Sequence, residues 1–308
     1  MRKLFMAAMA AVAAWATASA DVTTVKTLYS GDPVDVTWEN TLTIGAENFA
    51  DGVEVGDYLY ITFTKTTDVI EIKADGRWLP GSIKTFLGDN TPDFKAYITT
   101  DMLAALRQYG VEICGASFTV SGVSVCKDDF TMPEGAIWAG YFWIDTWTTM
   151  DLFKTAFDNY DGQRYMDIYL SGESDGSYFM QVMTAFDTPS AVWGATNSET
   201  RPMVEHTATK AVVDLQGIDV KTALADVNAL LIQGNKEGSN PFNITAIALR
   251  ADNTSTSINV VDLDAANAPV NVYNFQGMLV KSCVSLDEAL GTLPAGIYIA
   301  NGRKYVVR

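Results

Sequence analysis

The hydrophobic and polar residues of this chain alternate in a way that is typical of antiparallel β-strands. Short runs rich in β-branched and aromatic residues are separated by Gly, Asp, Asn and Pro. In residues 57–64, apolar side chains alternate with residues that would point to the opposite face, as in a half-buried strand. Helical patterns are few. The clearest covers residues 101–109, with Thr99 or Thr100 able to cap its start and Gly110 able to end it.

A pattern in the first half of the chain returns about a hundred residues later. Residues 28–31 followed by Trp38 match residues 137–140 followed by Trp147, and each copy closes with a helical pattern, a strand ending in Gly and a strand beginning with Phe. Pro80 and Pro189 share the spacing of the two Trp residues. Because such shared positions usually fill interiors, we expect Trp38 and Trp147 to pack in two equivalent cores.

Each copy has room for about eight short strands with frequent turns, which fits two sheets packed face to face. The sequence therefore predicts an all-β protein of two tandem β-sandwich or jelly-roll modules plus a small C-terminal β element. A closed barrel is the main alternative for each module. The predicted boundaries are residues 21–127 and 131–252 for the modules, joined by a linker at 128–133, and residues 257–308 for the C-terminal element.

The first twenty residues predict export. Arg2 and Lys3 precede an apolar run over residues 4–15, and the small residues 18–20 then suit a signal-peptide cleavage site. A membrane-spanning helix needs about twenty apolar residues, which neither this run nor a later one provides. We therefore expect a cleaved signal peptide over residues 1–20 and a location at the cell surface or outside the cell.

The charge and the cysteines narrow the partners and the chemistry. The formal net charge of −16 disfavours binding to the phosphates of nucleic acids and direct contact with anionic membranes. Cys114, Cys126 and Cys283 are too few for a disulfide-rich scaffold. A single bridge between Cys114 and Cys126 depends on a strand register that the sequence does not give.

The repeated pattern, Trp38 to Phe118 and Trp147 to Phe242, resembles the galactose-binding-like jelly-roll modules of secreted glycan-degrading bacteria. The resemblance lies in positions that would form the core and the turns. It implies carbohydrate binding or a purely structural spacer.

The C-terminal residues resemble a type IX secretion sorting domain. The resemblance covers the segments 270–280, 293–299 and 302–308, and its motif positions are Tyr273, Gly277, Gly296, Tyr298 and Lys304. It implies recognition by the secretion machinery. The alternative is a small β-domain that packs on the second module, with Asn301-Gly302 forming a hairpin turn and the basic residues protecting an edge strand.

Catalytic signatures are weak in this sequence. His206 is the only histidine and lies in a polar segment, so we expect an exposed loop residue instead of the base of a nucleophilic triad. One histidine and three scattered cysteines do not supply a zinc site. A glycoside hydrolase needs only two carboxylates. Candidates for such a pair are Glu39, Asp145, Asp167 and Glu173.

No cofactor is expected. Calcium is the alternative, at the Asp-rich turns 128–129 and 158–161, although neither turn matches a calcium-loop signature.

Aromatic side chains are the best candidates for a ligand site, since a sugar ring stacks on an exposed aromatic face. Trp78 is the first candidate because it lies on a turn with Asp75 and Arg77 and has no aromatic counterpart in the second copy. Further candidates are Trp143, Tyr141 and Trp193. We expect a secreted, non-catalytic protein that binds a glycan or surface polymer. A structural or adhesive surface protein is the second hypothesis, and a glycoside hydrolase is the third.

Overall fold

The computed structural model describes residues 22–65, 69–86, 92–145, 147–171, 176–186, 191–234, 240–251, 270–274, 279–283, 293–294, 296–300 and 303–307. The predicted signal peptide over residues 1–20 lies outside these ranges. The chain divides into two compact units, residues 1–252 and residues 253–308.

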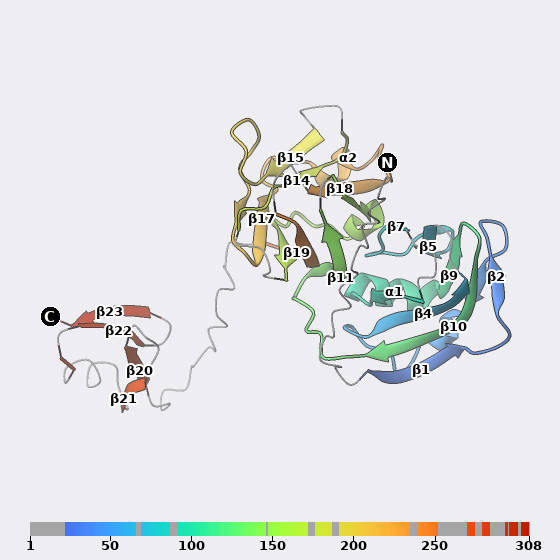
Figure 1. Ribbon diagram of the computed structural model, residues 1–308, viewed down its shortest axis with the longest axis horizontal. Helices are drawn as coiled ribbons and strands as arrows, with labels where there is room; N and C mark the ends of the chain where they lie inside the picture. The colour runs from blue at the N-terminus through green and yellow to red at the C-terminus, as the bar shows by residue number, and fades with distance from the viewer. Residues whose placement is uncertain are drawn as a thin grey trace, which may run out of the picture. The chain divides into compact units, whose positions relative to one another are not determined.

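The first half of the larger unit is a sandwich of two antiparallel sheets (Figure 1). One sheet has the strand order β1-β10-β4-β8, with β2 also paired to β10, and the other has the order β3-β9-β5-β6, with β7 also paired to β5. The strands are β1 (Thr23–Tyr29), β2 (Val34–Val36), β3 (Leu42–Ile44), β4 (Tyr58–Lys65), β5 (Val69–Ala74), β6 (Arg77–Trp78), β7 (Thr85–Phe86), β8 (Asp93–Tyr97), β9 (Val111–Gly115) and β10 (Phe118–Lys127).

The second half is another sandwich of two antiparallel sheets. Their strand orders are β11-β19-β13-β17-β16 and β12-β18-β14-β15. The strands are β11 (Ala136–Ile144), β12 (Thr149–Phe153), β13 (Tyr165–Leu170), β14 (Met180–Met183), β15 (Val192–Ala195), β16 (Glu205–His206), β17 (Lys210–Asp214), β18 (Ala229–Gly234) and β19 (Phe242–Arg250).

The two sandwiches have the same strand order. The path β1-β10-β4-β8 corresponds to β11-β19-β13-β17, and the path β3-β9-β5-β6 corresponds to β12-β18-β14-β15. A helix precedes β9 and β18 in turn, α1 (Thr100–Tyr109) in the first sandwich and the short α2 (Val220–Ala223) in the second. Thr99 caps α1 by accepting a hydrogen bond from the backbone of Met102. The all-β, two-sandwich fold class is thus confirmed, and no sheet among the described strands closes into a barrel.

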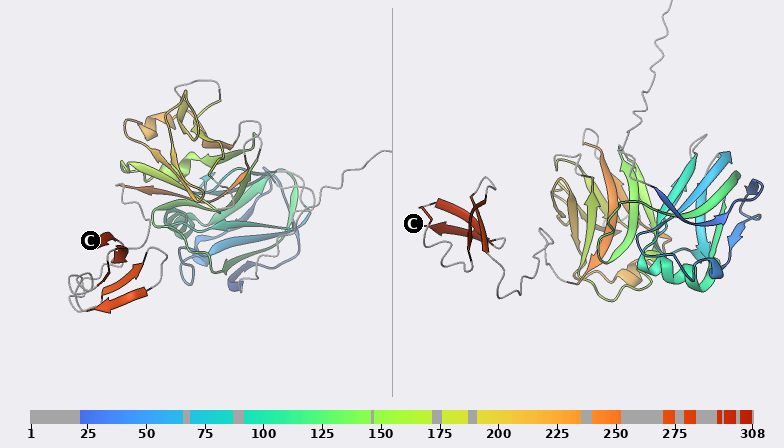
Figure 2. Two further views of the ribbon diagram at one scale, coloured as in Figure 1. Left: turned by 60° about the vertical axis from the view of Figure 1, so that its left-hand side comes forward. Right: turned by 90° about the horizontal axis from the view of Figure 1, so that it is seen from below.

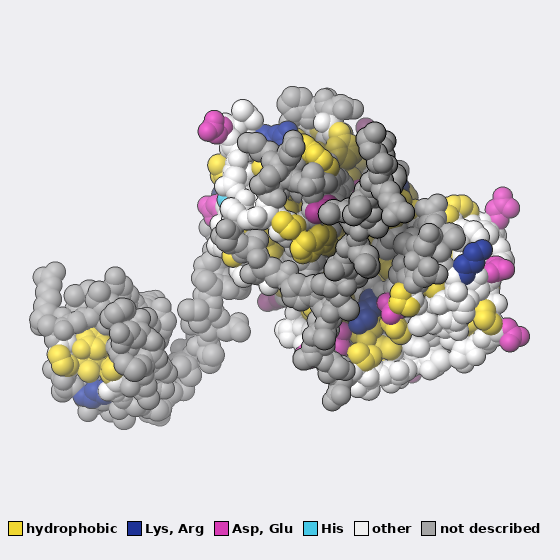
Figure 3. All heavy atoms as spheres, viewed as in Figure 1, with side chains coloured by type: hydrophobic (Ala, Val, Ile, Leu, Met, Phe, Trp, Pro, Cys, Tyr) yellow, Lys and Arg dark blue, Asp and Glu magenta, His cyan; other side chains and the backbone are white. Residues whose placement is uncertain are grey.

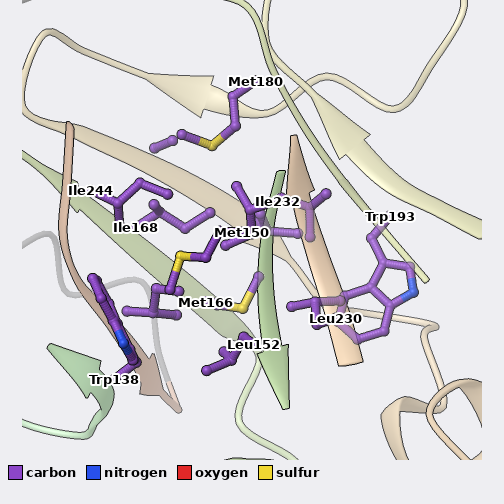
Figure 4. Packing of buried hydrophobic residues seen from close by; sticks show 14 of the residues in the cluster. Trp138, Met150, Leu152, Met166, Ile168, Met180, Trp193, Leu230, Ile232 and Ile244 are labelled. Atoms are coloured by element: carbon purple, nitrogen blue, oxygen red, sulfur yellow. The ribbon is translucent and has the colours of Figure 1, made fainter. Parts of the chain in front are cut away.

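Each sandwich has its own hydrophobic core between its two sheets. In the second, Met150 and Leu152 of β12 point inward, as do Met166 and Ile168 of β13 from the facing sheet (Figure 4). Asp151 and Asp167, which lie between them on these strands, are not part of the core, as the two-residue period of a strand requires. Trp138 and Trp193 also lie in this core.

The prediction that Trp38 and Trp147 fill cores is wrong. Their side chains are 50% and 59% exposed. Trp38 lies in the loop between β2 and β3, and Trp147 lies in the loop between β11 and β12. Because β3 and β12 are equivalent strands, each Trp lies in the loop that precedes the same strand of its sandwich. The repeat thus preserves a loop position and not a core position. Pro189, which shared the spacing, lies outside the described residues.

The cysteine and histidine environments also differ from the expectation. Cys114 and Cys126 are both free and buried, on strands of opposite sheets, so the conditional bridge is not formed. Burial raises the pKa of both thiols. His206 is half-buried in the short strand β16, with its ring centroid 5.4 Å from that of Tyr178, and is not an exposed loop residue.

The two sandwiches pack against each other within the larger unit (Figure 2). One part of their contact is a small hydrophobic cluster that includes Tyr58, Tyr97 and Cys126 of the first sandwich and Ala139 and Ala246 of the second. Beside it, residues 82–84 pair with β12. Lys84 donates its backbone N–H to Asp151 (3.1 Å), and Phe153 donates its backbone N–H to Ser82 (3.2 Å).

Gly81 makes this close approach possible. Its φ of 78° lies in the left-handed region, and a Cβ at this position would lie 2.7 Å from the carbonyl oxygen of Ile137 in the second sandwich. A side chain would therefore meet both backbone strain and a steric clash.

We expect Gly81→Ala to lower the free energy of unfolding by roughly 2–3 kcal/mol and to loosen the contact between the sandwiches. The matched control is Gly76→Ala, since Gly76 has a similar φ of 71° but open space around a Cβ. This control should cost only about 1 kcal/mol. Urea unfolding of both variants measures the difference, and equal losses would contradict the role of the clash.

The smaller unit contains a four-stranded antiparallel sheet with the order β21-β20-β22-β23. The strands are β20 (Val270–Asn274), β21 (Leu279–Cys283), β22 (Gly296–Ala300) and β23 (Arg303–Val307). Tyr273, Gly296 and Lys304 lie on β20, β22 and β23, and Gly277 lies outside the described residues. Tyr298 is buried and donates a hydrogen bond from its hydroxyl to the carbonyl oxygen of Pro294 (2.9 Å). Across the described residues, no helix has the length and apolar character that crossing a membrane requires.

Candidate functional site

A cleft of about 530 Å³ lies between the two sandwiches. The first sandwich contributes residues 81–86 and 93–97, and the second contributes residues 138–143 together with Thr148 and Thr149. The walls are fixed relative to each other by the backbone pairing of residues 82–84 with β12. The cleft is therefore preformed by the packing of the two modules.

Three exposed aromatic side chains line this cleft. Phe86 and Tyr141 are each 68% exposed, and Trp143 is 50% exposed. Tyr141 and Trp143 are two residues apart on β11, as side chains on one face of a strand are. The ring of Tyr141 also contacts Phe130 of the linker, with the centroids 6.5 Å apart. Hydrophobic side chains are exposed on both sandwiches in the face that Figure 3 shows.

The charged groups of the cleft are mainly basic. Lys84 and Lys95 both line it, and Asp93 is the acidic residue among its lining. Lys84 Nζ lies 5.0 Å from the ring centroid of Phe86, and Lys95 Nζ lies 4.7 Å from that of Tyr58. Asp93 accepts a hydrogen bond from the hydroxyl of Tyr60 (2.9 Å). Against a net charge of −16, the cleft thus carries a local excess of donors for ligand hydroxyl or carboxylate groups.

Two ionisable groups with raised pKa values, Asp151 and Tyr97, lie at or beside the cleft. Burial raises the pKa of Asp151, and the charge of Lys84 partly opposes that rise. Burial also raises the pKa of Tyr97, whose hydroxyl donates to Asp128 Oδ2 (2.7 Å), and the same bond raises it further. Asp128 also accepts the backbone N–H of Phe130 in the linker (3.1 Å), so Tyr97 and Asp128 tie β8 to the linker.

The predicted ligand residues divide into separate places. Tyr141 and Trp143 lie in the cleft. Asp75, Arg77 and Trp78 line a smaller groove of about 220 Å³. One face of Trp78 is covered, since its ring stacks on Phe153 with centroids 4.4 Å apart, and its Nε1 donates to Glu71 Oε2 (2.9 Å).

Arg77 and Trp193 both make contacts within the protein. Arg77 forms an ion pair with Asp158 of the second sandwich (2.8 Å). Trp193 is buried in the second core against Phe157, so it offers no free ring face to a ligand. Arg77 and Trp78 thus contact the second sandwich, and Trp193 stabilises the core.

Sequence reasoning missed Phe86, Lys84 and Lys95. Phe86 follows a Thr in a short strand, and nothing in the local pattern distinguishes it from a buried strand residue. Only the packing of the first sandwich on β11 brings it opposite Tyr141 and Trp143. The residues that line a cleft between two modules are distant in sequence, so no single segment carries a pattern that predicts the cleft.

The three described carboxylates considered for hydrolysis lie in different environments. Asp167 is buried in an ion pair with Arg250, Asp145 accepts a hydrogen bond from Thr148, and Glu39 is exposed beside β2. Glu173 lies outside the described residues. Among the described residues, no three His, Cys, Asp or Glu side chains cluster as metal ligands would.

No family model matches the sequence, and no curated protein matches it. Two solved structures show a weak likeness. One is A223, a turret protein in Sulfolobus turreted icosahedral virus, with 13% identity over 74% of this chain and 95% of that chain, at a TM-score of 0.19. The other is a presumed secreted protein from Parabacteroides distasonis ATCC 8503, with 11% identity over 75% of this chain and 88% of that chain, also at a TM-score of 0.19. Neither likeness carries an argument about fold or function at these values. The structure itself defines an all-β protein of two antiparallel sandwiches.

Proposed function

We propose that this protein is a secreted, non-catalytic carbohydrate-binding protein and that the cleft between the sandwiches is its binding site. The observation that carries the proposal is the gathering of Phe86, Tyr141 and Trp143, all exposed, in one preformed cleft. Exposed apolar side chains that gather in one patch usually mark a binding site, whereas single ones do not. The volume of about 530 Å³ suits a short stretch of a glycan chain.

The chemistry of the lining fits a sugar. The C–H face of a pyranose ring stacks on an aromatic ring, and its hydroxyl groups bond to nearby polar side chains. Lys84 and Lys95 offer donors, and Asp93 offers an acceptor. Because the walls are joined by backbone hydrogen bonds, little conformational entropy is lost when a ligand binds.

The test of this proposal is a glycan array followed by calorimetric titration of the best ligand. We expect Trp143→Ala to weaken binding at least about tenfold and the double variant Tyr141→Ala, Trp143→Ala to weaken it further. Trp38→Ala is the matched control, since Trp38 is also 50% exposed but does not line the cleft. It should bind like the wild type.

Three outcomes would contradict the proposal. Unchanged affinity in the double variant would place the site elsewhere. An absence of binding to every glycan would favour the structural or adhesive role. Release of reducing sugar from a bound polysaccharide, lost on substitution of a carboxylate, would favour the glycoside hydrolase.

We also propose that the smaller unit directs export by a type IX pathway. Supporting this are the strands β20, β22 and β23, which carry the motif positions Tyr273, Gly296, Tyr298 and Lys304. Fusing residues 253–308 to a periplasmic reporter in a host with type IX secretion tests it. We expect the reporter at the cell surface or in the medium, whereas retention of the reporter in the periplasm would contradict the proposal.

A further inference from the structure

We propose that a second saccharide site, specific for neutral sugars, lies in a groove on the second sandwich. The groove has a volume of about 460 Å³ and is lined by Trp147, Phe179, Gln181 and the loop 197–201. It shares no lining residue with the cleft between the sandwiches. The site rests on its own geometry and goes beyond the proposed function of the cleft.

Trp147 supplies the stacking surface. Its side chain is 59% exposed, and its backbone has a φ of 64°, in the left-handed region that bulky residues rarely adopt. Such a conformation costs about 1–2 kcal/mol, which a glycine at this position would avoid. A large ring that is exposed and also strained stabilises neither the core nor the backbone. Binding is the role that explains both features.

Gln181 supplies a polar floor. It lies on β14 directly across from Gln233 on β18, and its side chain is only 7% exposed. Its Nε2 donates to Gln233 Oε1 (2.5 Å), and Gln233 Nε2 donates to Thr149 Oγ1 (3.3 Å). The Oε1 atom of Gln181 is buried and has no hydrogen-bond partner among the described residues. Leaving such an acceptor unpaired costs about 1–3 kcal/mol, and a hydrogen bond from a ligand hydroxyl would recover part of that cost.

The rim determines the class of sugar. It carries one acidic and one basic side chain, Glu199 and Arg201, both exposed, so the groove has no net charge that would favour an acidic ligand. The loop is anchored at Asn197, which donates from Nδ2 to the carbonyl oxygen of Tyr178 (2.9 Å). Ser198 and Thr200 add hydroxyl groups. An aromatic ring beside amides and hydroxyls suits the C–H face and the hydroxyls of a neutral pyranose.

The test uses calorimetric titration of the full mature chain with neutral tetrasaccharides of glucose, galactose and mannose, and with tetragalacturonate. The cleft is first disabled by Tyr141→Ala and Trp143→Ala. In this background we expect a neutral tetrasaccharide to bind still, and Trp147→Gly or Gln181→Met to weaken it at least tenfold. Trp147→Gly should also leave the thermal unfolding temperature unchanged or raised, because it relieves the backbone strain. Trp38→Gly, at the equivalent loop of the first sandwich, is the control and should not change binding.

The two proposals fail in different ways. If adding Trp147→Gly or Gln181→Met to the Tyr141→Ala, Trp143→Ala background leaves the affinity for every tetrasaccharide unchanged, the groove is not a binding site. This result would not affect the proposal for the cleft, which its own variants test. If the cleft variants bind like the wild type and Trp147→Gly abolishes binding, the groove stands and the cleft fails. Preference for tetragalacturonate would overturn the assignment to neutral sugars, as would a wild-type protein that binds none of the neutral probes.

Discussion

Replacement of Asp167 by Ala should lower the free energy of unfolding by about 3–5 kcal/mol. Asp167 lies on β13 and is only 1% exposed. It accepts two hydrogen bonds from Arg250, from Nε (2.6 Å) and Nη2 (2.9 Å), and Lys210 Nζ lies 3.6 Å away. Removing the carboxylate leaves two largely buried cations without their counter-charge, and that desolvation is the main cost.

The neighbouring tyrosines do not compensate for this loss. Arg250 lies over the ring of Tyr165 (4.7 Å) and Lys210 lies near that of Tyr169 (5.8 Å), which places both cations against aromatic faces. A desolvated contact between a cation and an aromatic ring stabilises the folded protein by about 1–2 kcal/mol. This is less than the cost of leaving a buried charge without its partner.

The matched control is Asp214→Ala. Asp214 lies on the adjacent strand β17 and pairs with Arg164 (3.0 Å), but both side chains are almost half exposed. A pair of this kind contributes at most about 1 kcal/mol. Urea unfolding at pH 7 should therefore separate the two variants by several kcal/mol. Similar losses in both variants would contradict the argument that burial makes the Asp167 pair important.

Much of the fold could be predicted from the sequence because its signals are local. The alternation in residues 57–64 corresponds to β4, and the capped pattern at 101–109 corresponds to α1. The repeated order of strand, helix and strand appears as the same strand order in both sandwiches. These features depend on side-chain periodicity and on turn residues, which a single segment carries.

Burial of the tryptophans could not be predicted, because it depends on register and on neighbours that are distant in sequence. Trp143 and Trp193 both lie in strands, yet Trp143 is exposed on β11 and Trp193 is buried on β15. Register shifts in β11 between Ala139 and Phe142, and at β15 beside Val192, decide which face each side chain takes. The repeat indicated that Trp38 and Trp147 occupy equivalent positions in the two sandwiches, but it did not indicate that these positions lie in loops.

The cleft could not be predicted from the sequence either, because it also depends on contacts between distant segments. It is formed where residues 81–86 meet β11 and β12, and that meeting needs the close approach at Gly81. Tyr141 and Trp143 could be nominated from their spacing on one strand. Their partners Phe86, Lys84 and Lys95 come from a different module, and only tertiary packing brings them there.

The contact between the sandwiches should make the protein sensitive to alkaline pH. Burial is the main cause that raises the pKa of Tyr58 and of Tyr60 to about 12, from an ordinary value near 10, and it also raises that of Tyr97. In the unfolded chain these phenols lose their protons near pH 10, whereas in the folded chain they keep them to higher pH. The stabilisation is therefore fully present below pH 10 and is lost as the pH rises from 10 through 12.

We expect a loss of about 2 kcal/mol for each of Tyr58 and Tyr60 by pH 12. Urea unfolding between pH 8 and pH 11.5 measures it as a midpoint that falls steeply above pH 10. A midpoint that stays constant over this range would contradict the raised pKa values.

Two variants separate burial from hydrogen bonding in this response. The hydroxyl of Tyr58 is buried without a partner among the described residues, so Tyr58→Phe should leave stability at pH 8 unchanged or raise it by about 1–2 kcal/mol. Tyr97→Phe loses the hydrogen bond to Asp128 and should cost about 1–3 kcal/mol at pH 8. Both variants should flatten the fall above pH 10, because each removes one phenol that the folded state must keep neutral. If Tyr58→Phe destabilised the protein at pH 8 as much as Tyr97→Phe, the Tyr58 hydroxyl would have a partner, and its raised pKa would need a cause other than burial.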